Sequence, residues 1–120
     1  LFPYTTLFRS SKTHLSYLIN DVWRFKGVIL GSAAYNAGMM PPMEHFTKTM
    51  EHISPKNHYL GLFGSYSWTG GGVKTLNNFA ENIDWEMVAD PVDVKGVPDE
   101  EAFKGCETLA NAMADKLLQK

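Results

Sequence analysis

The chain has 120 residues, of which 44% are hydrophobic and 20% are charged, and its formal net charge is −2 at pH 7. This composition excludes intrinsic disorder and collagen, and the balanced charge argues against a nucleic-acid-binding surface. No apolar run approaches the roughly 18–20 residues of a membrane-spanning helix, so no membrane partner is expected. The single cysteine, Cys106, cannot form an internal disulfide, which fits a cytoplasmic location.

Charge is distributed unevenly along the chain. Residues 81–107 contain nine acidic side chains, against only Lys95 and Lys104 as basic ones. Two interpretations stay open: a solvated acidic face, or a docking patch for a basic partner such as an electron donor.

The first ten residues, LFPYTTLFRS, differ from the rest of the chain. They show no helical period, and they lack the basic start, apolar centre and cleavage site of a signal peptide. Because the string resembles translated sequencing-adapter read-through, we assign residues 1–10 as a non-native segment; the alternative is a genuine edge strand. The chain also begins with Leu1 rather than methionine, which we interpret as a processed product or a fragment of a longer gene.

Regular patterning starts at Ser11. Apolar residues at spacings of three and four predict helices, and short, fully apolar runs predict strands that are buried on both faces. The predicted elements, in chain order, are a helix from Ser11 or Thr13 to about Phe25, a strand at 28–30, a helix over 41–53, a strand at 59–63, a helix from about 72 to 83, a strand over 85–94 bent at Pro91, and a last helix that begins at about Asp99. The inward stripe of this last helix is predicted to contain Ala102, Phe103, Cys106, Leu109, Ala110, Met113, Ala114 and Leu117.

Alternation of helices and strands predicts the fold class. It is typical of crossover units, which build a parallel sheet with helices on both faces. Such a sheet usually has about five or six strands rather than three. We therefore expect a three-layer α/β domain that is truncated at its N-terminus.

Two segments that follow strands have an unusual composition. Residues 31–40 are small ones around Tyr35 and Asn36, and residues 64–72 read GSYSWTGGG. Ligands of open parallel sheets bind at the carboxyl ends of the strands. Small residues let a flat ligand approach the backbone, and aromatic side chains supply stacking faces. The pattern favours a planar heterocycle such as a flavin; the alternative is a mobile glycine-rich turn.

Other kinds of site fit less well. Residues 64–75 superficially resemble a phosphate-binding P-loop, but Val73 rather than glycine precedes Lys74. The four histidines have no metal-binding spacing, so each is predicted to be a helix-surface residue. Ser65 and Ser67 have no evident base partner. We therefore assign no metal ligand and no catalytic side chain.

Four stretches carry a family resemblance: SKTHLSYLINDVWRFKGVILGS, YNAGMMPPMEHF, GLFGSYSWTGGGVK and VKGVPDEE. Together they cover almost all of residues 11–120. In this order and spacing they resemble the C-terminal portion of the flavodoxin-like domain of flavodiiron proteins, also called A-type flavoproteins. The resemblance implies a flavodoxin-like three-layer αβα fold, with residues 11–120 as a partial FMN-binding domain.

The resemblance also implies where FMN would lie. Its ring would sit between the two segments, with Tyr35, Tyr66 and Trp68 as candidate neighbours, and backbone groups would tune its potential. The residues implied to line the cofactor are Ser32, Ala33, Ala34, Tyr35, Asn36, Ala37 and Gly38 on one side, and Gly64, Ser65, Tyr66, Ser67, Trp68, Thr69, Gly70 and Gly71 on the other.

Two departures from the family pattern matter. Ala33-Ala34 stand where the family usually has Pro-Thr, which would remove one hydrogen bond worth roughly 0.5–1.5 kcal/mol. In addition, the first two strands and the phosphate loop that grips FMN are expected to lie outside the chain.

The implied function is electron transfer. FMN would pass electrons from a rubredoxin-type or reductase donor to a diiron site in a missing N-terminal domain, where oxygen or nitric oxide is reduced. The fragment alone is not expected to be catalytic, and a homo-oligomer is implied for the full-length protein. The alternative is a free-standing flavodoxin or a flavodoxin-like quinone reductase.

Overall fold

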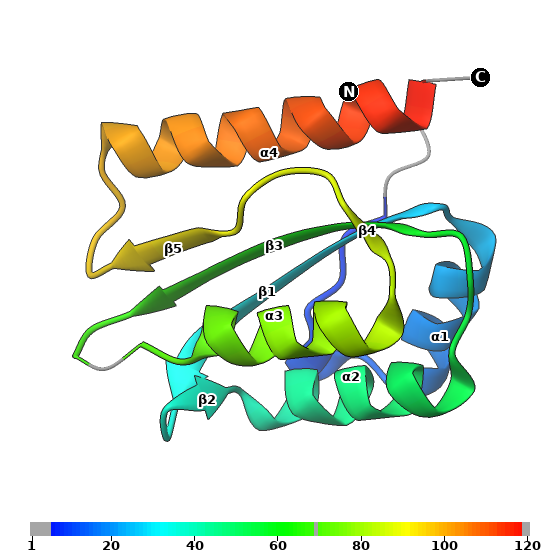
Figure 1. The fold of residues 1–120 in the computed structure, drawn as a ribbon. Helices are drawn as coiled ribbons and strands as arrows, with labels where there is room; N and C mark the ends of the chain where they lie inside the picture. The colour runs from blue at the N-terminus through cyan, green and yellow to red at the C-terminus, as the bar shows by residue number, and fades with distance from the viewer. Residues whose placement is uncertain (1–5, 69, 119–120) are drawn as a thin grey trace.

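The computed structural model describes residues 6–68 and 70–118, and its strands form a single sheet (Figure 1). The strands are β1 (Gly27–Tyr35), β2 (Gly38–Met39), β3 (Tyr59–Tyr66), β4 (Glu86–Met87) and β5 (Val92–Lys95). The helices are α1 (Leu15–Arg24), α2 (Pro41–Ile53), α3 (Gly72–Ile83) and α4 (Glu100–Leu118), preceded by a short 3₁₀ helix at Ser10–Lys12. Residues 1–5 of the segment that we excluded lie outside the described residues.

Strand pairing gives a mostly parallel sheet. Its order is β2-β1-β3-β4, and β5 continues beside β3 beyond β4. β3 is parallel to β1, β4 and β5, whereas β2 is antiparallel to β1. Figure 1 shows α1, α2 and α3 on one face of this sheet and α4 on the other. The predicted three-layer α/β architecture with a parallel sheet is therefore confirmed.

The main core lies between the sheet and the first three helices. Even-numbered residues of β1 and β3, such as Leu30, Leu60 and Leu62, are buried against this layer. The helices contribute Met43, Phe46, Met50, Leu76, Phe79 and Ile83. Among the described residues, no helix is long and apolar enough to cross a membrane.

Both central strands are longer than predicted. Their parallel register runs without a break from Gly27↔Tyr59 to Ala33↔Ser65. Residues 32–35 and 64–66 are therefore strand rather than loop. The small residues carry no hydrophobic pattern of their own, but pairing with the neighbouring strand holds them extended. In the 31–40 segment only Asn36 and Ala37 form the turn, both with positive φ, as a tight hairpin requires.

Two burial predictions were wrong. Cys106 is exposed, and Phe103 and Ala110 of the same predicted stripe are exposed as well, since α4 buries only Leu109 and Met113. His58, predicted at a helix surface, is buried instead. Its Nε2–H donates a hydrogen bond of 2.6 Å to the carbonyl of Val22 at the end of α1.

Candidate functional site

The carboxyl ends of β1 and β3 bring the two predicted segments together. Ala33 pairs with Ser65, so the strands run side by side up to their last residues. The turn after β1 and the loop after β3 leave the sheet at the same edge, because the strands are parallel. The structure thus places the two sequence-predicted segments next to each other.

Ser32 has a structural contact within the first segment. Its hydroxyl accepts a hydrogen bond of 2.8 Å from the backbone N–H of Met40 and donates one of 2.8 Å to the carbonyl of Ala33. The residue is 9% exposed. This hydroxyl is therefore engaged in holding the start of α2 against β1, so Ser32 offers a ligand its backbone rather than its side chain.

Glycines let the second segment pack directly on the first. Gly71 has φ +151, and a Cβ added there would overlap the carbonyl of Ala37 in the opposite turn. A Cβ at Gly64 would lie 2.6 Å from the carbonyl oxygen of Ser32. The two segments are in contact at these points, so a ligand would lie on the rim that they form together.

The rim carries aromatic side chains beside backbone N–H groups that form no backbone hydrogen bond to another described residue. Tyr35 is 50% exposed and Trp68 is 88% exposed, while Tyr66 is half-buried. Among the backbone hydrogen bonds between described residues, none uses the N–H of Ser67 or Trp68. Open aromatic faces beside unused N–H donors fit a planar ring with a polar edge. Thr69, also predicted here, lies outside the described residues.

Asp93 is a charged group beside this rim that the sequence analysis did not single out. It lies on β5 opposite Gly64. Its Oδ1 lies 3.8 Å from where a Cβ would stand at Gly64, and its Oδ2 lies 3.8 Å from where one would stand at Gly70. Asp93 is exposed, but partial desolvation of its carboxyl group by the neighbouring segment raises its pKa above the ordinary value of 3.8. The sequence shows an acidic residue in the strand after Pro91. It does not show that this residue pairs with Gly64, because the register between β3 and β5 is known only from the structure.

Asp93→Asn is expected to stabilise the chain slightly at neutral pH. The folded state binds the Asp93 proton more tightly than the unfolded state does, so stability falls as pH rises through the window from the ordinary pKa to the raised one. Above that window the charged form is fully penalised, and the variant should have the higher melting temperature. Thermal melts at pH 7 and pH 3 test this: the gain should shrink at pH 3, and an unchanged gain would point to another cause.

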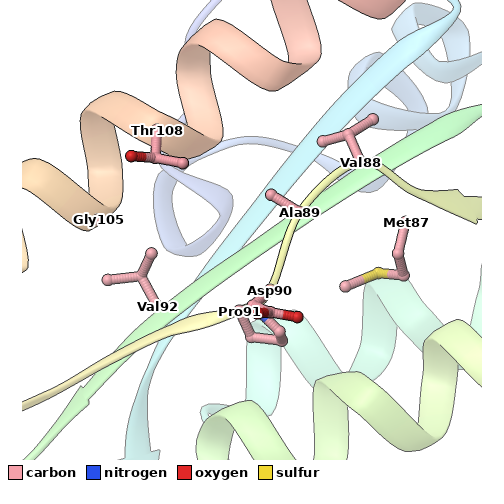
Figure 2. Close-up of a pocket in the computed structure, with 8 residues that line it drawn as sticks. All are labelled: Met87, Val88, Ala89, Asp90, Pro91, Val92, Gly105 and Thr108. Atoms are coloured by element: carbon pink, nitrogen blue, oxygen red, sulfur yellow. The ribbon is translucent and has the colours of Figure 1, made fainter.

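Hollows lie in the surface of the described residues, one beside the rim and one away from it. One of about 170 Å³ is lined by residues 31–33, Ser10, Ser11 and the start of α2. A larger one, of about 650 Å³, lies between the β4–β5 connection and α4 and is lined mostly by apolar side chains of residues 87–92, which are drawn in Figure 2. No pattern in the sequence predicted this second hollow. In the part of the chain that the structure describes, no group of three His, Cys, Asp or Glu residues could hold a metal ion.

No protein-family model matches the chain, but curated proteins do. It is 30% identical over 107 residues to rubredoxin-oxygen oxidoreductase of Megalodesulfovibrio gigas, covering 89% of this chain and 27% of that protein. It is 29% identical over 108 residues to the anaerobic nitric oxide reductase flavorubredoxin of Escherichia coli K12, covering 90% of this chain and 22% of that protein. The chain therefore spans about a quarter of the length of these relatives.

Solved structures agree with this similarity. The structure of rubredoxin oxygen:oxidoreductase from Desulfovibrio gigas matches with a TM-score of 0.88 at 28% identity, over 93% of this chain and 28% of that one. An archaeal flavodoxin matches with a TM-score of 0.74 at 21% identity, over 92% of this chain and 75% of that one, which shows the flavodoxin-like fold. The chain is thus homologous to the flavodiiron proteins, and the homology covers their flavodoxin-like part.

Proposed function

We propose that residues 11–120 belong to an FMN-binding electron-transfer domain of a flavodiiron protein. The observation that carries this proposal is the rim at the ends of β1 and β3, where exposed aromatic side chains stand beside the N–H groups of Ser67 and Trp68, which donate no backbone hydrogen bond to another described residue. The homology to flavodiiron proteins supports it. FMN, when bound, would supply the one- and two-electron chemistry.

The chain's own groups would bind and orient the ring. Tyr35 and Trp68 would offer flat apolar faces, and the N–H groups of Ser67 and Trp68 would donate to the polar edge of the ring. The carboxylate of Asp93, beside the second segment, would disfavour added negative charge nearby. No side chain is required to act as acid, base or nucleophile.

For the whole protein, the names of the relatives suggest its place in electron flow. Rubredoxin-oxygen oxidoreductase and nitric oxide reductase flavorubredoxin name a redox donor and two terminal acceptors. We propose a rubredoxin-type or reductase donor, a diiron acceptor site outside this chain, and a cytoplasmic homo-oligomer. A free-standing flavodoxin or flavodoxin-like quinone reductase is the second candidate, favoured by the fold match to flavodoxin. A set of diiron ligands encoded upstream in the gene would favour the flavodiiron protein over the free-standing flavodoxin or quinone reductase.

The 120-residue chain is expected to bind FMN weakly, and to bind riboflavin almost as well. Both proposed segments would contact the ring, whereas the loop that grips the phosphate is expected to lie outside the chain. Titrations that follow flavin fluorescence should give affinities for the two flavins within about threefold, a difference below 1 kcal/mol. Sub-micromolar FMN affinity together with much weaker riboflavin binding would contradict the expectation that this chain lacks the loop that binds the FMN phosphate.

The variant Trp68→Ala, measured in the same titration, tests whether the flavin ring binds at the proposed rim. Removing this exposed ring should weaken both flavins equally, since it deletes a stacking face. The matched control is Trp23→Ala, because Trp23 is also exposed, at 61%, but lies on α1. If neither flavin binds the wild-type chain, or if both variants behave alike, the proposed rim is not the flavin site.

A further inference from the structure

The connection between β4 and β5 leaves backbone groups unpaired at the end of the sheet. β4 and β5 both pair with β3, and among the described residues no strand pairs with their other edge. Within residues 88–91, the only backbone hydrogen bond to another described residue is the one that the N–H of Val88 donates to the carbonyl of Leu60. The N–H groups of Ala89 and Asp90 donate none. An extended segment of another chain would therefore find backbone partners here.

The apolar hollow of about 650 Å³ lies directly beside this connection. Gly105 and Thr108 line it from the α4 side (Figure 2). A Cβ added to Gly105 would lie 3.4 Å from a methyl group of Val92, so the helix and β5 are in contact at one end of the hollow. Pockets that take ligands have volumes of roughly 300–1,000 Å³, so this one has room for apolar side chains. Its apolar lining consists of Met87, Val88, Ala89, Pro91 and Val92.

Three acidic side chains stand around the hollow. Asp90 lines it and is exposed. On α4, Glu101 lies four residues before Gly105, and Asp115 lies seven residues after Thr108. These spacings place both carboxylates on the side of the helix that borders the hollow, and both residues are exposed.

Basic side chains do not balance this charge. Lys104 lies four residues before Thr108 and adds one positive charge on the same side of α4. Lys116, nearer the end of the helix, forms an ion pair of 2.8 Å with Glu86. In the described part of the chain, the three carboxylates around the hollow form no salt bridge. The hollow is thus an apolar surface with a negative border.

We propose that the hollow and the β4–β5 connection form a docking surface for a basic, extended segment of a partner protein. The backbone of the segment would pair with residues 88–91, and its apolar side chains would enter the hollow. Its lysine or arginine side chains would lie against Asp90, Glu101 and Asp115. The surface lies away from the rim, so the inference does not depend on flavin binding.

A second copy of this chain fits the surface less well. Each copy has a net charge of −2, and a contact between two such hollows would bring their acidic borders together. A helical partner would leave the N–H groups of Ala89 and Asp90 without acceptors, because a helix pairs its own backbone. An extended segment with positive charge satisfies both the backbone and the border.

Fluorescence anisotropy with defined peptides tests this proposal on the flavin-free chain. The probe is a short labelled peptide that alternates lysine with leucine. Two matched peptides replace every lysine by glutamate or every leucine by serine. The probe should bind at least about tenfold more tightly than either, because like charges repel and apolar anchors supply most of the binding energy. Hydrogen exchange should show new protection at the amides of Ala89 and Asp90 when the probe is bound.

Two pairs of variants locate the contact. Thr108→Trp fills the hollow and should weaken probe binding by about tenfold or more, whereas Asn111→Trp adds the same ring to the exposed outer side of α4 and should not. Asp90→Asn should weaken binding by about twofold to fivefold. Glu81→Gln is its control, because it removes an equal, exposed charge from α3 on the opposite face of the sheet.

Three results would overturn the proposal: equal binding of the lysine and glutamate peptides, equal losses in the two tryptophan variants, or unprotected amides at Ala89 and Asp90. Circular dichroism shows whether each variant is folded. If Thr108→Trp unfolds the chain, the comparison of Asp90→Asn with Glu81→Gln decides in its place, and equal affinities there would overturn the proposal. Self-association of the chain that Asp90→Asn strengthens and the probe displaces would show that a second copy is the occupant instead.

Discussion

Gly71→Ala is expected to destabilise the chain by about 2–4 kcal/mol and to disrupt the rim at the strand ends. Gly71 has φ +151, a conformation that only glycine adopts readily, and its added Cβ would overlap the carbonyl of Ala37. The backbone at Gly71 or at Ala37 would have to move, because the atoms of Ala37 that the Cβ would meet are backbone atoms and not the end of a flexible side chain. Urea denaturation followed by circular dichroism measures the stability, and the flavin titration measures the rim.

Gly96→Ala is the matched control for this substitution. Gly96 also has a positive φ, +72, but no atom lies within 4 Å of its would-be Cβ. It should therefore show backbone strain alone, about 1 kcal/mol. Equal losses in the two variants would mean that contact between the segments contributes nothing beyond conformational strain.

The bounds of α2 and α3 could be predicted from the sequence because local chemistry sets them, whereas α1 begins at Leu15 with His14 as its cap, and not after Ser11 or Thr13 as predicted. Pro41 and Pro42 suit the first turn of α2, which spans Pro41–Ile53 as predicted. The apolar period of α3 runs from Gly72 to Ile83, and the helix has these predicted ends. The break at Pro91 likewise separates β4 from β5. These signals depend on residues near in sequence.

Strand length and helix burial could not be predicted, because distant contacts decide them. Residues 32–35 are extended since Ser32 and Ala33 pair with β3. The spacing of α4 permits a wide apolar stripe, but the sheet beneath it buries only Leu109 and Met113. Cys106 is therefore exposed although its spacing was that of a core residue.

The candidate site was predictable in its location but not in its contacts. Two unusual segments after parallel strands had to meet at one edge of the sheet. The packing of Gly71 on Ala37, the internal hydrogen bonds of Ser32 and the approach of Asp93 all depend on the register between strands. Sequence spacing alone contains no information on that register.

Trp85→Ala is expected to cost about 3–5 kcal/mol of stability, the largest effect that we predict for a core side chain. Trp85 is 5% exposed and precedes β4. Its indole N–H donates a hydrogen bond of 2.7 Å to the carbonyl of Pro55. Its ring stacks on His58 with the ring centroids 4.7 Å apart, and it forms a T-shaped pair with Phe79 at a centroid distance of 5.7 Å. Truncation would remove all three contacts and leave a cavity.

Trp85→Phe separates packing from hydrogen bonding in this cluster. It keeps an aromatic ring but leaves the Pro55 carbonyl without its donor, so a loss of about 1–3 kcal/mol is expected. Chemical denaturation of both variants gives the two free energies. A loss for Trp85→Phe as large as that for Trp85→Ala would mean that the hydrogen bond, rather than packing, dominates.

The position of Trp85 also makes the variants informative about the site. His58, on which Trp85 stacks, holds the end of α1 through Val22, and Pro55 follows α2. This cluster joins the helical layer at the amino-terminal ends of β3 and β4, whereas the rim lies at the carboxyl ends of β1 and β3. Trp85→Phe should therefore lower stability and leave flavin affinity unchanged under conditions where the chain remains folded. A parallel loss of flavin affinity in the folded variant would show that the two ends of the sheet are coupled.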